Sequence, residues 1–285
     1  LFRPGKGEEV QQAHRYLQQQ AKVPMLIAAN LEAGGTGSAI DGTRIGNPML
    51  LAAGQDAEFG HHLGEVCAKE GSAVGVNWAF APVVDIDYNF HNPITNVRTY
   101  GSDPETVLNY AKGFVEAVQQ NGVAASIKHF PGDGIDFRDQ HLVTTVNTLL
   151  LEEWRSTYGK VYSGLIEAGS LSVMIGHIAL PAVQKSGEDA FLPATLSPVI
   201  MQELLREELG FNGVITSDAT PMVGFCAAME RRLAVPTAIA AGCDIFLFNK
   251  DLEEDIRFMK EGIENGILKL ERIDEAVTRI LAMKA

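Results

Sequence analysis

Short, continuously apolar segments alternate along the chain with longer segments in which apolar residues recur at helical spacing. Because the short segments do not alternate polar and apolar residues, both faces of the strands that they form are expected to be buried. Strands are predicted at 25–29, 74–84, 123–128, 171–178, 213–216 and 243–248. Helices are predicted at 8–21, 56–70, 103–120, 150–168, 199–209, 228–241, 252–264 and 271–283. This order predicts right-handed βαβ units and a parallel sheet.

Polar side chains stand at or just beyond the C-terminal end of each predicted strand, whereas the strand starts carry glycine or small residues. These side chains are Asn30, Asp85, Lys128, His177, Asp218 and Asn249. Any strand end that meets solvent turns polar, which explains one or two of them but not all. In a closed barrel these ends converge on one mouth, where such enzymes keep their sites.

The predicted fold class is therefore α/β, a TIM-type (β/α)8 barrel that is irregular or lacks its first strand. The six predicted strands approach the eight of such a barrel, and Leu1 and Phe2 look like the end of a further strand. No G-x-G-x-x-G follows any strand, which disfavours a dinucleotide-binding sheet. We expect one domain over 1–285.

The segment 126–141, SIKHFPGDGIDFRDQH, concentrates ionisable groups on a loop. Its apolar strand ends at Lys128 and His129, and the proline and glycines that follow force a turn. An ordinary solvated turn needs glycine and proline, but it does not need a lysine, two histidines and three aspartates. We therefore interpret the segment as an active-site loop.

Composition excludes several classes of function. The net charge of −13 and the absence of a basic cluster argue against a nucleic-acid or anionic-membrane surface. No apolar run approaches a membrane span of about 18 residues, and there is no signal peptide at the start, so we expect a cytoplasmic protein, although the abrupt start at Leu1 leaves an upstream export signal open. Cys67, Cys226 and Cys243 lie apart in apolar contexts, as buried free thiols do. Without zinc-like spacing or a phosphate loop, we expect no metal and no cofactor.

The loop also carries a family resemblance. The motif Lys128-His129-Phe130-Pro131-Gly132, the group Asp139-Gln140-His141, and Ser217-Asp218 with Met222 behind it resemble glycoside hydrolase family 3, in particular its bacterial β-N-acetylglucosaminidases. The likeness continues through Asn30-Leu31-Glu32, Phe80-Ala81-Pro82-Val83, Arg98 and the stretch from Met174 to His177. It spans 24 to about 248, and the combination of motifs is far more specific than any one of them.

The resemblance implies a barrel fold and hydrolysis with retention through a covalent glycosyl-enzyme. Asp218 matches the family's nucleophile, although an aspartate there could instead cap the next helix. His141, oriented by Asp139, matches an acid/base dyad in which histidine replaces the usual second carboxylate; a loop pair of this kind could also be a surface salt bridge. The residues that match sugar binders are Lys128, His129, Arg98, Asn30, Met174 and His177.

Three departures from the family pattern bear on the substrate. Asn30 replaces an aspartate, and the arginine that often follows the Glu-Gly-Gly motif is missing after Glu32-Ala33-Gly34-Gly35. Asp133 replaces the histidine of the usual KHFPG-H-G. The first two leave the exact sugar open, and the third changes the charge near the loop while the Asp139/His141 pair stays intact.

The predicted function is a β-N-acetylhexosaminidase that removes terminal β-linked N-acetylglucosamine. The alternatives are a β-glucosidase-like enzyme of the same family, a β-N-acetylglucosaminide phosphorylase, and an inactive carbohydrate-binding barrel. The expected partner is a carbohydrate, an amino-sugar glycoside of the kind a cell wall supplies, with no nucleic acid and no membrane. A C-terminal domain and a homodimer both remain open.

Overall fold

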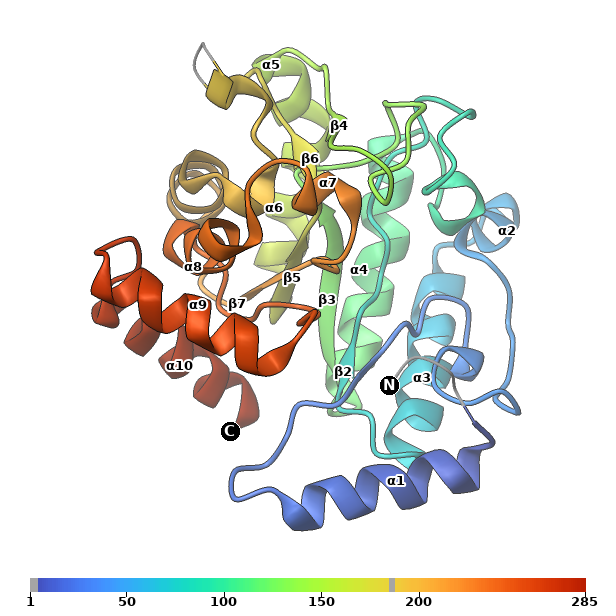
Figure 1. The fold of residues 1–285 in the computed structure, drawn as a ribbon. Coiled ribbons are helices and arrows are strands. Elements are labelled where there is room, and N and C mark those ends of the chain that lie inside the picture. The colour runs from blue at the N-terminus through green and yellow to red at the C-terminus, as the bar shows by residue number, and fades with distance from the viewer. Residues whose placement is uncertain (1–4, 185–187) are drawn as a thin grey trace.

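Parallel strands form the central sheet, in the order β1-β2-β3-β5-β7 (Figure 1). The structure is a computed structural model that describes residues 5–184 and 188–285, so the expected strand end at Leu1 and Phe2 lies outside it. The strands of this sheet are β1 (Ala28–Ala29), β2 (Trp78–Ala79), β3 (Ala124–Phe130), β5 (Ser172–Ile175) and β7 (Val214–Ser217). A second, small sheet pairs β4 (Thr145–Val146) with β6 (Ile178–Ala179), also in parallel. The curled parallel sheet confirms the predicted TIM-type barrel, in an irregular form.

The predicted helices appear in the predicted order, together with two short helices that were not predicted, α2 and α7. These helices are α1 (Gly7–Gln20), α2 (Pro48–Ala53), α3 (Glu58–Ala73), α4 (Pro104–Gln120), α5 (Leu151–Trp154), α6 (Lys160–Glu167), α7 (Val223–Cys226), α8 (Arg231–Ala241), α9 (Leu252–Glu264) and α10 (Leu270–Lys284). The π-helical turns η3 (Arg155–Gly159) and η6 (Val199–Glu208) complete the predicted helices 150–168 and 199–209. The short 3-10 turns are η1 (Gly35–Gly37), η2 (Asn96–Arg98), η4 (Glu188–Phe191) and η5 (Ala194–Leu196). None of the helices in the described part of the chain is both long and apolar enough to span a membrane.

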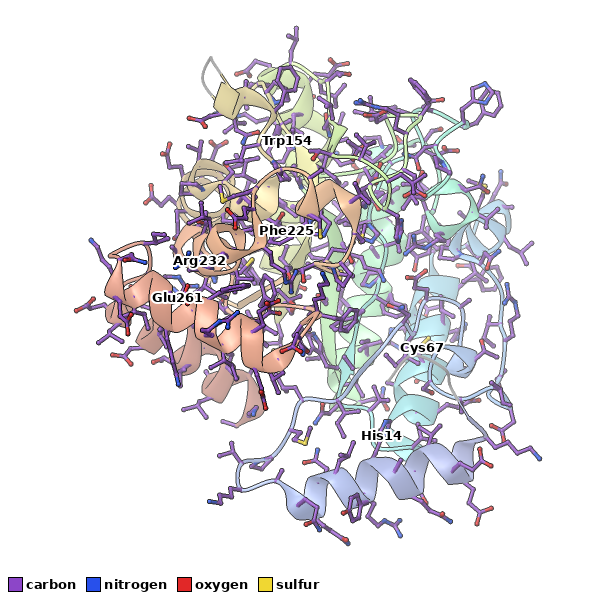
Figure 2. All side chains as sticks on the ribbon, in the orientation of Figure 1. His14, Cys67, Trp154, Phe225, Arg232 and Glu261 are labelled. Carbon is purple, nitrogen blue, oxygen red and sulfur yellow. The ribbon has the colours of Figure 1, made fainter. Side chains whose placement is uncertain are left out.

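Local chemistry sets the helix boundaries and the helix contacts. The Asp103 side chain accepts a hydrogen bond of 2.8 Å from the Thr106 amide and caps α4, with Pro104 in the first turn, as predicted. α3 and α4 pack side by side because Gly60 presents no side chain: a Cβ atom there would collide with the Tyr110 carbonyl oxygen (Figure 1). Between α8 and α9, Arg232 and Glu261 form an ion pair of 2.6 Å (Figure 2).

Three predicted strands are shorter than expected. Of 74–84 only β2 (Trp78–Ala79) pairs as a strand, and 171–178 is divided into β5 and β6. In 25–29 and 243–248, side chains take the place of backbone partners. In 25–29, Asn77 and Gln18 bond to the backbone of Met25 and Ile27, and only Ala28–Ala29 pairs as strand. In 243–248, the Ser217 hydroxyl bonds to both the amide and the carbonyl of Leu247. That segment joins the sheet through a single bridge between Thr216 and Ile245.

A seam therefore remains in the barrel wall. Among the described residues, no ladder joins β1 to the segment 244–248. A cavity of about 390 Å³ lies between them, lined mainly by apolar side chains. His14 and Leu17 of α1 border it on one side, and Ile280 and Lys284 of α10 border it on another.

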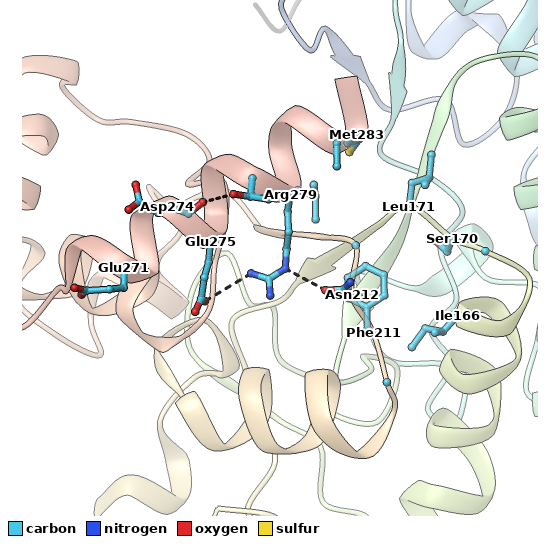
Figure 3. A pocket seen from close by; sticks show the side chains of 16 residues that line it. Ile166, Ser170, Leu171, Phe211, Asn212, Glu271, Asp274, Glu275, Arg279 and Met283 are labelled. Atoms are coloured by element: carbon cyan, nitrogen blue, oxygen red, sulfur yellow. Dashed lines mark hydrogen bonds and ion pairs between the residues drawn. The ribbon is translucent and has the colours of Figure 1, made fainter. Parts of the chain in front are cut away.

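A larger cavity of about 900 Å³ lies at the opposite end of the strands from Asp218, where β5 and β7 begin (Figure 3). Arg279 on its wall contacts Asn212 and Glu275. Beside it, the buried carboxylate of Asp244 pairs with three arginines. These are Arg206 at 2.7 Å, Arg272 at 2.6 Å and Arg279 at 3.6 Å. The cluster ties α10 and η6 to the start of the segment 244–248.

Candidate active site

A cavity of about 200 Å³ opens at the C-terminal ends of β3, β5 and β7. Seven of the nine predicted site residues line it: Asn30, Arg98, Lys128, His129, His141, Met174 and Asp218. Of the six polar strand ends, Asn30, Lys128 and Asp218 thus meet at one mouth, as expected for a barrel, whereas Asp85, His177 and Asn249 do not line the cavity. Phe80, Met222 and Leu247 add apolar wall.

One side of the cavity is built around Glu32. Its carboxylate accepts two hydrogen bonds of 2.8 Å from the Arg98 guanidinium and forms an ion pair of 2.6 Å with the Lys128 ammonium. Lys128 also donates to the Asn30 side-chain oxygen at 3.2 Å. Two cationic side chains, Lys128 and Arg98, and the Asn30 amide thus stand in fixed positions at the cavity wall, which suits the recognition of sugar hydroxyls.

Burial and pairing oppose each other in this cluster. Burial works against the charge of Glu32, but the two cations outweigh it and hold the pKa of Glu32 well below its usual range. For Lys128, whose side chain is only 3% exposed, burial lowers the pKa even though Glu32 acts to raise it. The charge on Lys128 therefore depends on Glu32.

A second buried arrangement supports His129. The Asp85 carboxylate, fully buried, accepts from His129 Nδ1 at 2.7 Å and from its backbone amide at 3.1 Å. This turns His129 Nε2 toward Asp218, 4.0 Å from the carboxylate oxygen Oδ2. The pair fixes the ring and holds Nε2 beside the Asp218 carboxylate.

Asp218 follows β7 directly, and its backbone amide donates to the Ile175 carbonyl at 2.8 Å. Its carboxylate accepts the Ala219 amide at 2.7 Å. Burial would raise the pKa of Asp218, but His129 and the other neighbouring donors outweigh it and lower the pKa. The next helix, α7, begins at Val223 with Met222 at its cap position, so Asp218 does not cap it. An ionised carboxylate held rigidly at the cavity is suited to nucleophilic attack.

His141 also lines the cavity, and it pairs with Asp139, which is not a lining residue. His141 Nδ1 and its backbone amide both contact the Asp139 oxygen Oδ1 at 2.7 Å. The carboxylate fixes the ring and leaves Nε2 to take up and release a proton. The His141 side chain is 56% exposed, so both solvent and a leaving group can reach it.

The loop that carries His141 is attached to the rest of the barrel. The Val223 amide donates to the His141 carbonyl at 2.9 Å, and the Gly224 amide donates to the Gln140 carbonyl at 3.2 Å. The Thr144 hydroxyl bonds to the Gly224 carbonyl at 2.8 Å. At the base of the loop, the Trp154 indole donates to the Pro131 carbonyl at 2.8 Å (Figure 2).

His177 lies behind the cavity wall and does not line it. The ring is buried, and both of its nitrogens have partners: Thr195 Oγ1 at 3.0 Å from Nδ1, and the Ala219 carbonyl at 3.0 Å from Nε2. A carbonyl only accepts, so Nε2 carries the proton. Burial lowers the pKa of His177 and favours this neutral ring. The expectation of direct sugar contact is therefore replaced by a supporting position under the residue after Asp218.

Three residues of the site were not among the catalytic and sugar-binding residues predicted from the sequence: Glu32, Asp85 and Gln140. Glu32 and Asp85 do follow predicted strands, which is the signal that could have found them. Gln140 stands between Asp139 and His141, is fully buried and lines the cavity. Within 5–184 and 188–285, no group of three or more His, Cys, Asp or Glu side chains is placed to hold a metal ion.

Comparison with known proteins agrees with this geometry. The model of the glycosyl hydrolase family 3 N terminal domain matches residues 4–283. The chain therefore belongs to glycoside hydrolase family 3.

Individual relatives differ in what they are named for. A beta-N-acetylglucosaminidase/beta-glucosidase of Cellulomonas fimi is 49% identical over 274 residues, which cover 94% of this chain and 49% of the relative. A structure of a beta-glucoside phosphorylase, BglX, superposes with a TM-score of 0.97 at 48% identity, over 99% of this chain and 52% of that chain. A structure of a glycoside hydrolase family 3 beta-N-acetylglucosaminidase from Paenibacillus sp. str. FPU-7 superposes with a TM-score of 0.91 at 32% identity, over 99% of this chain and 56% of that chain. The chain thus spans about half the length of these relatives.

Proposed function

We propose that the chain is the catalytic barrel of a retaining exo-acting glycosidase that removes a terminal β-linked sugar, principally N-acetylglucosamine. The observation that carries the proposal is that the His141–Asp139 pair and the carboxylate of Asp218 stand at one cavity. These are the two chemical functions that retaining glycoside cleavage requires. The relatives named for β-N-acetylglucosaminidase activity support the choice of sugar.

In the proposed reaction, the Asp218 carboxylate attacks the anomeric carbon and forms an ester with the sugar. His141 gives its proton to the departing oxygen, so the aglycone leaves as an alcohol. In the second step the now neutral His141 removes a proton from water, which attacks the anomeric carbon and releases Asp218. Asp139 steadies the imidazolium in the states that carry it.

The size and lining of the cavity support exo action on one sugar unit. Its volume of about 200 Å³ is below the range of about 300–1,000 Å³ typical of sites for drug-sized ligands. Lys128, Arg98 and Asn30 offer donors and an amide for the ring hydroxyls. Met174 and Phe80 offer apolar surface for the ring carbons.

Removal of the His141 side chain tests the proposal. The His141→Ala variant should lose on the order of 10²–10⁴-fold in turnover of a natural sugar leaving group, which needs a proton, and much less on an activated aryl glycoside, which does not. The glycosyl-enzyme should then accumulate, because water attack has lost its base. Azide should rescue turnover and give a β-glycosyl azide.

Equal impairment on both substrates without azide rescue would refute the role of His141. If the starting protein binds the sugar but turns over no aryl glycoside, it is instead the inactive carbohydrate-binding barrel. A panel of aryl glucosaminides with and without the N-acetyl group, together with the aryl glucoside, separates the hexosaminidase from the β-glucosidase-like alternative.

A second candidate is phosphorolysis, in which phosphate replaces water in the second step. Among the described residues that line the cavity, Asp218 is the one that bears a carboxylate, and it is bonded to the sugar at that stage. A neutral histidine does not repel phosphate as a second carboxylate would. The structural relative named as a β-glucoside phosphorylase supports this candidate. Formation of sugar 1-phosphate in phosphate buffer, faster than release of free sugar, would establish it.

A further inference from the structure

A buried polar chain connects the loop of His141 to the strand end that carries His129. Gln140 Nε2 donates to Asp133 Oδ2 at 3.1 Å, and Gln140 Oε1 accepts the His177 backbone amide at 2.9 Å. On its other side, the Asp133 backbone amide donates to Asp85 at 2.8 Å, and Asp85 holds His129. Asp133 and Gln140 are both buried, with 2% and 0% exposure.

The direction of each hydrogen bond in this chain is fixed. The His177 amide can only donate, so Gln140 must present its oxygen to that amide and its NH₂ group to Asp133. The other oxygen of Asp133 accepts from the Gly134 amide at 2.7 Å and from Asn92 Nδ2 at 2.8 Å. Three N–H donors thus meet one carboxylate, and the ionised form satisfies all of them.

We propose that Asp133 is a positioning residue that sets the place of His141 over Asp218 through its hydrogen bond to Gln140. The inference rests on the proposed acid/base role of His141. Gln140 is the residue immediately before His141. Both ends of its side-chain amide are hydrogen-bonded, and its backbone carbonyl accepts from the Gly224 amide. Asp133 itself does not line the cavity, so it acts through its partners: its side chain reaches the His141 loop through Gln140, and its backbone amide contacts Asp85.

The groups around Asp133 explain why its carboxylate needs the hydrogen bond from Gln140. Burial, and then the neighbouring Asp85 carboxylate, raise the pKa of Asp133 to about 6, while His129 and the donors oppose that rise. Tyr158 from η3 donates to the Asp133 carbonyl. The carboxylate is therefore a destabilised anion for which the Gln140 donor is a needed partner.

The polarity of this single hydrogen bond can be reversed. In Asp133→Asn, the new NH₂ group faces the NH₂ group of Gln140, so two donors meet. In Gln140→Glu, a second carboxylate faces Asp133, so two acceptors meet at a pH high enough for both to be ionised. In the double variant, the new amide at position 133 can donate to the new carboxylate at position 140 while the His177 amide keeps its acceptor. The chain is then complete again with its total charge unchanged.

The readout is the ratio of kcat/KM on a natural sugar leaving group to kcat/KM on an activated aryl glycoside. Both values come from one preparation, so any unfolded fraction cancels from the ratio. Misplacement of His141 should lower the ratio by about 10²-fold in each single variant, since small displacements of a catalytic group cost rates of that order. The double variant should recover most of this loss, to within roughly tenfold of the starting protein.

Gln184→Glu is a matched control, because Gln184 is also a buried amide, bonded to Leu180 and Leu192 away from the cavity. It should lower the melting temperature and leave the ratio unchanged. Single variants that keep the ratio, or a double variant that recovers the melting temperature but not the ratio, would overturn the proposal. His141→Ala is measured in parallel: if its ratio does not change, the acid/base role of His141 has failed, independently of Asp133.

Discussion

Replacement of Glu32 by glutamine should leave two cations, Lys128 and Arg98, without their shared negative partner. The glutamine side chain has nearly the same shape, but it has no charge and can accept only through one oxygen. The present carboxylate takes one contact of 2.6 Å from Lys128 and two of 2.8 Å from Arg98. The side chains of Lys128 and Arg98 are 3% and 32% exposed, respectively. Water can therefore screen Arg98 after the substitution far better than Lys128, which is reached only through the small active-site cavity.

The magnitude follows from these exposures. Hydrogen bonds to charged groups contribute about 1.5–3 kcal/mol each to stability when buried, so loss of the Lys128 contact should lower the free energy of unfolding by about 2–3 kcal/mol. Loss of the Arg98 contacts, which solvent partly screens, should lower the free energy of unfolding by roughly 1 kcal/mol more. The total of about 3–4 kcal/mol lies within the range of about 3–5 kcal/mol seen when one partner of a buried ion pair is removed.

Two pH dependences of opposite sign should accompany the loss. Without Glu32, which acts to raise the pKa of Lys128, that pKa falls further below its ordinary value. Lys128 then loses its proton as the pH rises, so the deficit in unfolding free energy should shrink toward alkaline pH, where no unpaired charge is buried. Sugar binding should instead weaken toward alkaline pH, because the neutral amine donates fewer hydrogen bonds.

Urea unfolding and kcat/KM at several pH values measure both trends. Glu105→Gln is the control, since Glu105 pairs with Lys160 at the surface, where both side chains are about half exposed. It should cost less than about 1 kcal/mol with no effect on the pH profile of activity. A Glu32→Gln protein as stable as this control, or one whose sugar binding has the same pH profile as the starting protein, would refute the reasoning.

Further predictions concern single residues. Asp218→Ala should abolish turnover and leave the melting temperature nearly unchanged. Full activity of this variant on an activated aryl glycoside would contradict the role of Asp218 as nucleophile. Asp244→Asn should lower the unfolding free energy by about 3–5 kcal/mol, because three largely buried arginines lose their shared partner, as denaturant titration would show. Gly134→Ala should also destabilise the fold, since Gly134 has φ +109° and a Cβ atom would collide with the Ile86 carbonyl; a thermal melt equal to the starting protein's would argue against this. Because the folded-state pKa of Asp133 is raised to about 6, its contribution to stability is present at acid pH and is lost as the pH rises through that value, so Asp133→Asn should flatten this part of the stability profile.

The sequence allowed the barrel and most of the site to be predicted because both depend on local patterns. A buried strand that ends in a polar residue is visible in the sequence at Lys128 and Asp218, and the start of α4 is visible in Asp103 and Pro104. The loop pair Asp139 and His141 is also local. Its members contact each other at 2.7 Å, as its spacing suggested.

The remaining features depend on contacts between distant parts of the chain. Glu32 meets Arg98, 66 positions later, and nothing near it in the sequence indicates that ion pair. His177 looks like any other polar strand end, and its burial behind the cavity follows only from the packing of Thr195 and Ala219 against it. The shortness of the segment 244–248 as a strand arises because Ser217 supplies a side-chain hydrogen bond in place of a backbone one.

The seam between β1 and the segment 244–248 has a consequence for folding kinetics. These two segments lie roughly 220 positions apart, so bringing them together carries the largest loop-closure entropy of any neighbours around the sheet. Without a backbone ladder across the seam, that closure also gains little hydrogen-bond energy. The β3–β5–β7 strands can therefore form first as a unit, and the seam closes last and opens first. Backbone amides beside the seam cavity should accordingly exchange with solvent faster than those of β3, even though both are part of one barrel wall.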